Sequence, residues 1–358
     1  MSLAVTVLKN SAVLLLFLLF ISCGTKNKEY ANNVFPYSQF PQEKELKGEV
    51  IELDTALFRY PFRIRIEGDK AIVLDLHGSD YYGHLFQYPS FRYLSSFGRR
   101  GDSPLEMLSM ENFRLHNHTL WTLDANKSEL TRLDFSSSGD SLLREETVAL
   151  DEDILRPLDF AIYNDTTFVI PDYSGESRFL KVDCKGKLIE KIGTIPTTNK
   201  KALQEARPAL AQAWRSFLDY NSHNSVLATV TQLGEVVEIY NLKDSTHVIR
   251  VGEYDEPEFK VSDGYGIPTG IMGFSDVQVT DDAIYAVFHG TSFKDIARQS
   301  GRLSDGGKYI YVFSLKGEPL CKYVLDHYIY GIWVDEVTKT IMATDANNDQ
   351  PILKFSFG

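Results

Sequence analysis

The sequence predicts an all-β fold, a six-bladed β-propeller with four-stranded antiparallel blades, from three observations. A short apolar strand, a polar turn and a second apolar strand recur about six times along the chain. The copies are spaced by roughly 50 to 60 residues, as in propeller blades. Aromatic residues make up 12% of the chain, and Val, Ile, Tyr and Phe dominate the strand-like runs. We expect one closed domain, because each blade must stack on its neighbours to cover both its faces.

The first apolar residues of the copies are Ile64, Phe113, Phe160, Phe217, Val277 and Ile332. Blades one to five each show four strand-like runs, and we place them at 61–98, 113–150, 159–193, 215–251 and 275–325. Blade six offers only three runs, at 328–335, 340–344 and 352–357. The fourth strand of the last blade must therefore come from elsewhere in the chain.

The run 48–54 lies just before blade one and has strand length, with Val50, Ile51 and Leu53 apolar. A closed ring removes the open edge that an unfinished circle of blades would expose. We therefore expect this N-terminal strand to pair with 352–357 and to close the last blade.

The first 22 residues are expected to be a signal peptide. Residues 12–21 form an apolar run that is shorter than the about 20 residues a membrane-spanning helix needs. The ending 19–23, Leu-Phe-Ile-Ser-Cys, resembles a bacterial lipobox. It implies cleavage before Cys23, lipidation of its sulfur and attachment to a membrane leaflet. A soluble secreted protein and an uncleaved anchor helix are the alternatives.

Residues 23–46 are expected to be the lipidated cysteine and a polar tether, and residues 47–358 the propeller. The tether carries Lys, Asn and Pro and offers too little apolar surface to fold by itself. Cys184 and Cys321 fall in different blades, so the sequence does not support a disulfide framework. The net charge is −12 and no cluster of five basic residues occurs, so nucleic acid is not an expected partner.

Four long segments interrupt the short turns, at 99–111, 194–214, 252–274 and 290–307. Because antiparallel strands alternate in direction, all four emerge on the same face, which we call the decorated face. Loops on one rim of a rigid scaffold usually carry binding sites, although neutral insertions are the alternative. Residues 200–217 have helical spacing, and we expect a short helix, bent or started at Pro208, that packs its apolar stripe on the propeller rim.

Residues 97–106, Phe-Gly-Arg-Arg-Gly-Asp-Ser-Pro-Leu-Glu, follow the first blade. Here the chain resembles the TolB-like six-bladed β-propeller lipoproteins of gut-dwelling Gram-negative bacteria. The resemblance implies the fold and a lipid anchor, and it carries over no settled activity. The segment after Cys23 lacks the acidic run of surface-exported lipoproteins in such bacteria, which favours the periplasmic side of the cell envelope. Arg99 and Glu106 are candidate partners in an ion pair.

Candidate binding residues on the decorated face follow second strands or lie in its long segments. They are Arg99, Arg100, Glu106, Asp75, His77, Asp172, Tyr173, His289, Asp345 and Asn347. The weaker candidates Asn112, Asp159 and Asp276 open inner strands around the central channel, where oxygen ligands could hold Ca²⁺. Turn chemistry explains a repeated Asp at a strand end equally well and is favoured, because the carboxylate can accept backbone N–H groups two residues on.

The favoured function is that of a membrane-tethered extracytoplasmic lipoprotein, a non-enzymatic scaffold without a cofactor that binds a partner protein or an envelope ligand on the decorated face. The alternative is a Ca²⁺-dependent, lactonase-like hydrolase or lyase with its site at the central channel. The sequence contains no GxSxG, P-loop or HExxH motif that would indicate common catalytic machinery. The pair His116 and His118 lies in a tight turn of the opposite face and is expected to be solvated.

Overall fold

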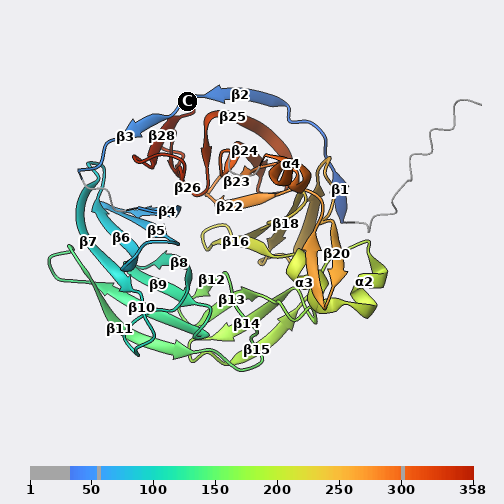
Figure 1. The fold of residues 1–358 in the computed structure, drawn as a ribbon, viewed down its shortest axis with the longest axis horizontal. Helices are drawn as coiled ribbons and strands as arrows, with labels where there is room; N and C mark the ends of the chain where they lie inside the picture. The colour runs from blue at the N-terminus through green and yellow to red at the C-terminus, as the bar shows by residue number, and fades with distance from the viewer. Residues whose placement is uncertain (1–32, 55–57, 300–302) are drawn as a thin grey trace, which may run out of the picture. The chain divides into compact units, whose positions relative to one another are not determined.

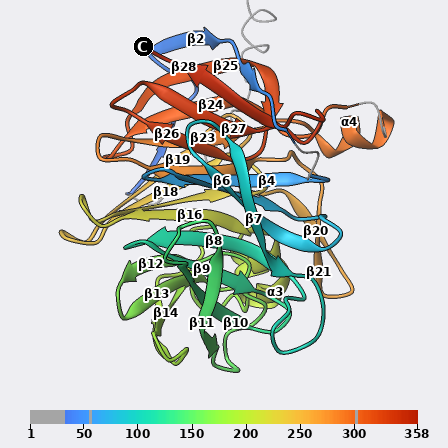
Figure 2. The same ribbon diagram turned by 90° about the vertical axis from the view of Figure 1, so that its left-hand side faces the viewer.

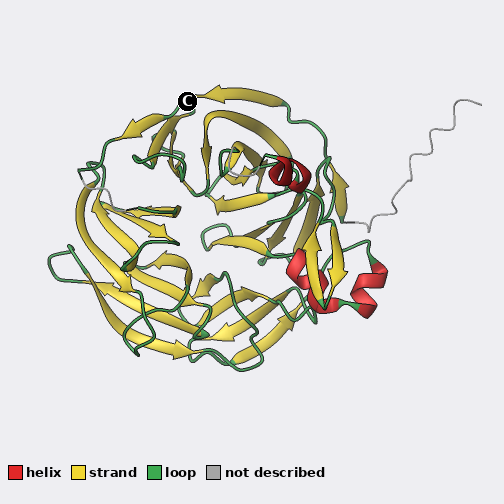
Figure 3. Cartoon of the chain, in the orientation of Figure 1, coloured by secondary structure: helices red, strands yellow, loops and turns green. Residues whose placement is uncertain are grey.

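The computed structural model describes residues 33–54, 58–299 and 303–358, and these residues form a six-bladed β-propeller (Figure 1). The blades follow one another around a central axis in chain order. The predicted signal peptide and Cys23 lie outside the described residues. Strands make up nearly all the regular structure, and the helices gather on one side of the view (Figure 3).

Each of blades one to five is built from four consecutive antiparallel strands, which follow one another from the axis outward. Blade one has β4 (Pro61–Glu67), β5 (Lys70–Asp75), β6 (Tyr81–Gln87) and β7 (Arg92–Arg99). Blade two has β8 (Met110–His116), β9 (Thr119–Asp124), β10 (Glu129–Phe135) and β11 (Leu142–Ala149). Blade three has β12 (Ala161–Asn164), β13 (Thr167–Pro171), β14 (Phe179–Asp183) and β15 (Leu188–Ile192). Blade four has β16 (Ser216–Asn221), β17 (Val226–Thr231), β18 (Val236–Asn241) and β19 (Thr246–Val251), and blade five has β22 (Phe274–Val279), β23 (Ala283–Phe288), β24 (Gly307–Ser314) and β25 (Pro319–Ile329).

Blade six is closed by the N-terminal strand, as predicted. Its strands are β26 (Ile332–Asp335), β27 (Thr340–Thr344), β28 (Ile352–Ser356) and then β3 (Glu49–Ile51). β3 runs antiparallel to β28, with Ile51 opposite Ile352 and Glu49 opposite Lys354. Figure 1 shows the blue N-terminal strand beside the red C-terminal one. The two ends of the propeller therefore share one sheet.

The tether prediction is wrong for residues 34–46, because this segment forms two further strands. β1 (Val34–Pro36) adds in parallel to β19 at the outer edge of blade four. β2 (Gln42–Leu46) adds in parallel to β25 of blade five. An outer strand presents unpaired N–H and C=O groups that another strand can use without burying much apolar surface. In β2 only Leu46 is buried, so a polar sequence can form this strand.

Three of the four long segments, 194–214, 252–274 and 290–307, fold into additional helices or strands. α2 (Lys200–Glu205) and α3 (Arg207–Ala213) confirm the predicted helix, broken at Ala206. Leu210 and Trp214 are buried against Val236 and Ile249 of blade four, as expected for a stripe packed on the rim. The hairpin of β20 (Phe259–Ser262) and β21 (Tyr265–Pro268) and the helix α4 (Phe293–Arg298) were not predicted from the sequence. Figure 2 shows the hairpin and α4 on the same side of the propeller.

Candidate functional site

The first strand of each blade runs along the central axis. A residue's place in this strand therefore sets its position between the decorated face and the opposite face. In β22, Phe274 lines a cavity at the decorated face and Gln278 lines a cavity at the opposite face. Asp276 lies between them and is fully buried. The axis therefore has two mouths with a buried layer between them.

The buried layer consists of ion pairs. The Asp276 carboxylate contacts the guanidinium groups of Arg63 and Arg65, the latter at 3.0 Å. Arg114 Nη2 lies 2.7 Å from Asp159 Oδ1. Burial raises the pKa of Asp276, but the two arginines outweigh it and hold that pKa below its ordinary value. Burial lowers the pKa of Arg63 to about 10, so this guanidinium stays charged at neutral pH.

The same carboxylates join neighbouring blades through backbone N–H groups. Asp159 Oδ2 accepts from Leu218 N at 3.0 Å, and Asp276 Oδ2 accepts from Ile332 N at 2.9 Å. Asp219 Oδ2 accepts from Val279 N at 2.8 Å. Each of these aspartates thus binds the first strand of the next blade. These bonds fix the spacing of the blades around the axis.

The candidate calcium ligands do not converge on one point. The Asn112 amide binds Asp159, whereas Asp276 is held by Arg63 and Arg65. Across the part of the chain that the structure describes, no group of three or more His, Cys, Asp or Glu side chains is arranged to hold a metal ion. The oxygens proposed as ligands are bonded to protein donors instead.

The aspartates after second strands form turns, which confirms the favoured interpretation. Asp75 accepts from the backbone N of Arg59, Tyr60 and His77 at 2.8, 2.7 and 3.1 Å. Asp172 accepts from Ser174 N and Ser177 N, both at 2.8 Å. Asp345 accepts from Asn347 N at 2.8 Å. These buried carboxylates hold the loops of the decorated face in place, and their oxygens accept hydrogen bonds from the protein's own backbone and side chains.

Most of the remaining polar candidate residues also contact other residues of the protein. Arg99 Nε lies 3.4 Å from Glu106 Oε1, so the predicted ion pair is confirmed. The Arg100 guanidinium lies 3.7 Å from the Tyr82 ring centroid and donates to the Leu76 carbonyl. His77 packs edge-on against Tyr60, and Asn347 accepts from Asp305 N at 2.7 Å. Burial raises the pKa of Tyr173 to about 12, so its phenol is neutral.

The cavity at the decorated face is lined mainly by apolar side chains, and we call it the aromatic pocket. It has a volume of about 230 Å³ and is lined by Phe62, Phe217, Gln232, Leu233, Met272, Gly273, Phe274, Ser275, His289, Phe293 and Tyr330. Phe62 lies 5.9 Å from Phe217 and 5.3 Å from Tyr330, ring centroid to ring centroid. The Arg63 guanidinium lies 4.8 Å from the Phe217 centroid, so the buried ion pairs adjoin the pocket.

His289 is the one sequence-predicted residue among those that line the aromatic pocket. Its side chain is buried, and its Nε2 has no hydrogen-bond partner among the described residues. Burial lowers the pKa of His289 to about 4, although Asp305 acts in the opposite direction. The imidazole is therefore neutral at physiological pH and adds one polar atom to an apolar site.

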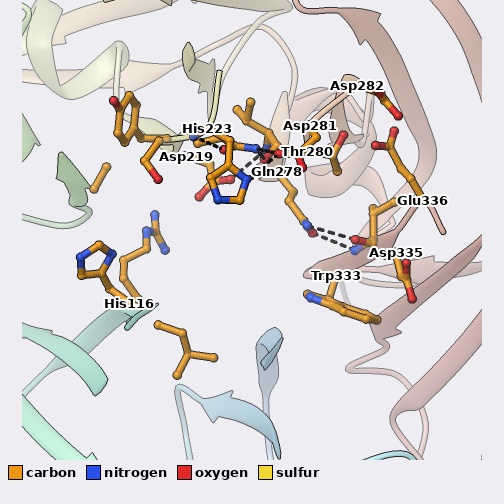
Figure 4. A pocket seen from close by; sticks show the side chains of 18 of the residues that line it. His116, Asp219, His223, Gln278, Thr280, Asp281, Asp282, Trp333, Asp335 and Glu336 are labelled. Carbon is orange, nitrogen blue, oxygen red and sulfur yellow. Dashed lines mark hydrogen bonds and ion pairs between the residues drawn. The ribbon is translucent and has the colours of Figure 1, made fainter. Parts of the chain in front are cut away.

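A larger cavity of about 520 Å³, which was not predicted from the sequence, opens at the opposite face (Figure 4). The ends of first strands from blades two to six line it. Figure 4 shows the carboxylates Asp219, Asp281, Asp282, Asp335 and Glu336 around it, with Trp333 and the imidazoles of His116 and His223.

Several of these groups are bonded to neighbouring turns. His116 Nε2 lies 2.8 Å from Asp165 Oδ1, and His223 Nδ1 lies 3.1 Å from Asp281 Oδ1. Burial raises the pKa of Asp219, against the influence of Arg65 and Arg114. The mouth is acidic and polar, in contrast to the aromatic pocket.

The sequence matches the family model of the TolB-like 6-blade propeller-like proteins over residues 39–337. A Bacteroides fragilis protein that carries the name exported protein is similar in structure, with a TM-score of 0.57, 12% identity and coverage of 90% of this chain and 98% of its own. A member of the DUF4221 family from Bacteroides vulgatus has a TM-score of 0.53, 10% identity and coverage of 88% and 96%. An auxiliary nutrient binding protein from Bacteroides ovatus has a TM-score of 0.52, 10% identity and coverage of 84% and 70%.

At these identities the structural likeness shows the fold alone. No curated protein matches the sequence. None of the helices within the described ranges combines the length and the apolar composition of a membrane span.

Proposed function

Because the chain belongs to the TolB-like six-bladed propeller family, we propose that it is a non-enzymatic binding protein of the cell envelope. A lipid on Cys23 holds it to a membrane, on the periplasmic side. Its decorated face binds a partner protein or an envelope ligand. The observation that carries this proposal is the aromatic pocket, where loops of several blades leave an apolar cavity open at the axis.

The composition of the aromatic pocket suits binding. Ligand sites are mostly apolar and contain a few placed polar groups, and here those groups are the Gln232 amide and the neutral His289 imidazole. The volume of about 230 Å³ is below the roughly 300–1,000 Å³ of pockets that enclose a whole drug-sized ligand. We therefore expect the pocket to hold one apolar group of a larger partner. The structural likeness to a nutrient binding protein is compatible with this role.

A binding role also agrees with the state of the polar groups near the pocket. Catalysis by a general base needs a titratable group near neutral pKa and a partner that orients it. His289 has its pKa lowered to about 4, and the described residues offer no hydrogen-bond partner to its Nε2. The carboxylates of the buried layer are bonded to arginines and backbone N–H groups.

Filling the aromatic pocket is expected to abolish ligand binding without unfolding the protein. We would change Met272 to Trp, because Met272 lines the pocket but is only partly buried. Lipids and peptides extracted from the native envelope, each of which can place one apolar group in the pocket, should raise the melting temperature of the wild type, since a ligand that binds only the folded state stabilises it by RT ln(1 + [L]/Kd). The Met272→Trp variant should show no rise.

Leu105→Trp serves as the matched control, because Leu105 is 77% exposed in another loop of the decorated face and does not line the pocket. It should respond like the wild type. An equal rise in melting temperature for Met272→Trp would show that the ligand binds elsewhere.

Changing Cys23 to Ser is expected to release the protein from the membrane fraction or leave it unprocessed. A lipid chain contributes about 0.8 kcal/mol per buried CH₂ group, so its loss removes most of the membrane affinity. Fractionation of cells that express the wild type and the variant measures this directly. If the variant stays with the membranes as the wild type does, the lipid anchor is refuted.

A further inference from the structure

We propose that the β20–β21 hairpin contacts the lipid surface to which the protein is anchored. This proposal rests on the lipid anchor at Cys23 proposed above. The partner surface is a bilayer of zwitterionic lipid, and the contacting side chains are Val261, Tyr265 and Ile267, which we call the apolar tip. The contact would hold the propeller in one orientation relative to the membrane.

The hairpin is joined to the propeller by one of its faces only. β20 and β21 form a separate two-stranded sheet that is hydrogen-bonded to no blade. Gly266 N donates to Gln212 Oε1 of α3 at 2.9 Å, and a Cβ at Gly266 would collide with the carbonyl oxygen of Ala209. Phe259 packs against the apolar cluster that contains Trp214. α3 thus supports the hairpin from behind.

The other face and the end of the hairpin next to the turn are exposed. Tyr265 and Ile267 are 61% and 48% exposed on the face away from Gly266. Val261 is opposite Gly266, on the supported face, but it lies next to the turn and is 53% exposed. Lys260 lies directly opposite Ile267, and opposed residues of an antiparallel pair share a face. A tyrosine, aliphatic side chains and a lysine that can extend its amine toward water are typical of elements at a membrane interface.

The start of the propeller places this hairpin near the anchor. Val34 of β1 packs against the same apolar cluster as Phe259 of β20. Cys23 and Asn33 are ten positions apart in the chain. An extended chain spans at most about 3.3–3.6 Å per residue, so the lipid lies within about 35 Å of the outer edge of blade four. The tether therefore keeps the hairpin side of the propeller close to the bilayer.

The size and charge of the apolar tip favour lipid over a protein partner. A stable protein interface buries about 800 Å² on each side. The apolar tip is only three side chains, and the polar residues Lys260, Ser262 and Asp263 lie directly beside them in the hairpin. Lys260 and Asp263 carry opposite charges, and the chain as a whole is acidic, with a net charge of −12. This balance favours a zwitterionic surface over an anionic one.

A fluorescent label at the apolar tip tests the proposal. Full-length lipidated protein with Cys184→Ser and Tyr265→Cys would carry the environment-sensitive dye NBD and be reconstituted on phosphatidylcholine–phosphatidylethanolamine vesicles. The control carries the dye at Val337→Cys, because Val337 is 93% exposed in the turn between β26 and β27 on the opposite face. We expect a blue shift and a several-fold rise in emission at position 265, with neither at position 337.

Flotation of the same vesicles separates the hairpin from the anchor. If the protein floats but the dye at position 265 reports water, the hairpin proposal is wrong and the anchor stands. If the protein does not float, the anchor fails and the hairpin proposal fails with it. If the emission shifts only in native membranes that contain other proteins, the apolar tip docks a protein, and contact with lipid is refuted.

Discussion

Changing Asp276 to Asn is expected to lower the free energy of unfolding by about 3–5 kcal/mol, because removing one partner of a buried ion pair leaves an uncompensated charge. Here two guanidinium groups, those of Arg63 and Arg65, lose their carboxylate. The side chain is fully buried, so water cannot replace it. Urea unfolding followed by circular dichroism measures the loss.

Asp282→Asn is the matched control for this change. Asp282 lies in the exposed turn after β22, and an exposed change of this kind usually alters stability by no more than about 0.5 kcal/mol. If Asp276→Asn costs as little as the control, the ion-pair layer does not hold the blades together.

Deleting Ile352–Gly358 is expected to unfold the whole propeller. The deletion removes β28, in which Ile352, Leu353 and Phe355 are fully buried. Each such side chain contributes about 1.5–3 kcal/mol, so the loss approaches the roughly 5–15 kcal/mol of a whole domain. It also leaves β3 without a partner. Calorimetry should show no native-like transition.

Single substitutions in β3 test the contribution of the N-terminal strand to the closed sheet of blade six. Ile51→Pro removes a backbone N–H from β3, whereas Ile51→Ala keeps it, so the proline variant should melt at a clearly lower temperature in one cooperative transition. Two separate transitions, with only blade six unfolding early, would contradict the view that the closing sheet stabilises the entire ring.

The sequence predicted the blades because their pattern is local. Alternating apolar residues and polar turns mark strands, and the spacing of the copies marks blades. It also predicted the closure, because blade six lacked one strand and 48–54 was an unassigned strand-length run that pairs with β28. β1 and β2 could not be predicted in this way. They pair through backbone groups at blade edges, and no apolar pattern encodes that pairing.

The sequence predicts the candidate site less well, because the polar residues that follow the strands mark turns and not the pocket. Asp75, Asp172 and Asp345 proved to be turn formers, in agreement with the favoured interpretation. The aromatic pocket was not foreseen apart from His289. A signal for it exists in the sequence, since Phe62, Phe217, Phe274 and Tyr330 stand at or just before the start of first strands in four blades. Their convergence becomes visible only when the ring is closed.

In the proposed function, the ligand binds at the decorated mouth of the channel, and photo-crosslinking in living cells tests this most directly. A photoreactive diazirine amino acid close to methionine in size, which leaves the pocket open, would replace Met272 in the aromatic pocket or His223 at the opposite mouth. After irradiation, the mass of the purified protein reveals any adduct. The proposed function predicts an adduct from position 272 and none from position 223. An adduct from position 223 alone, or from neither position, would contradict it.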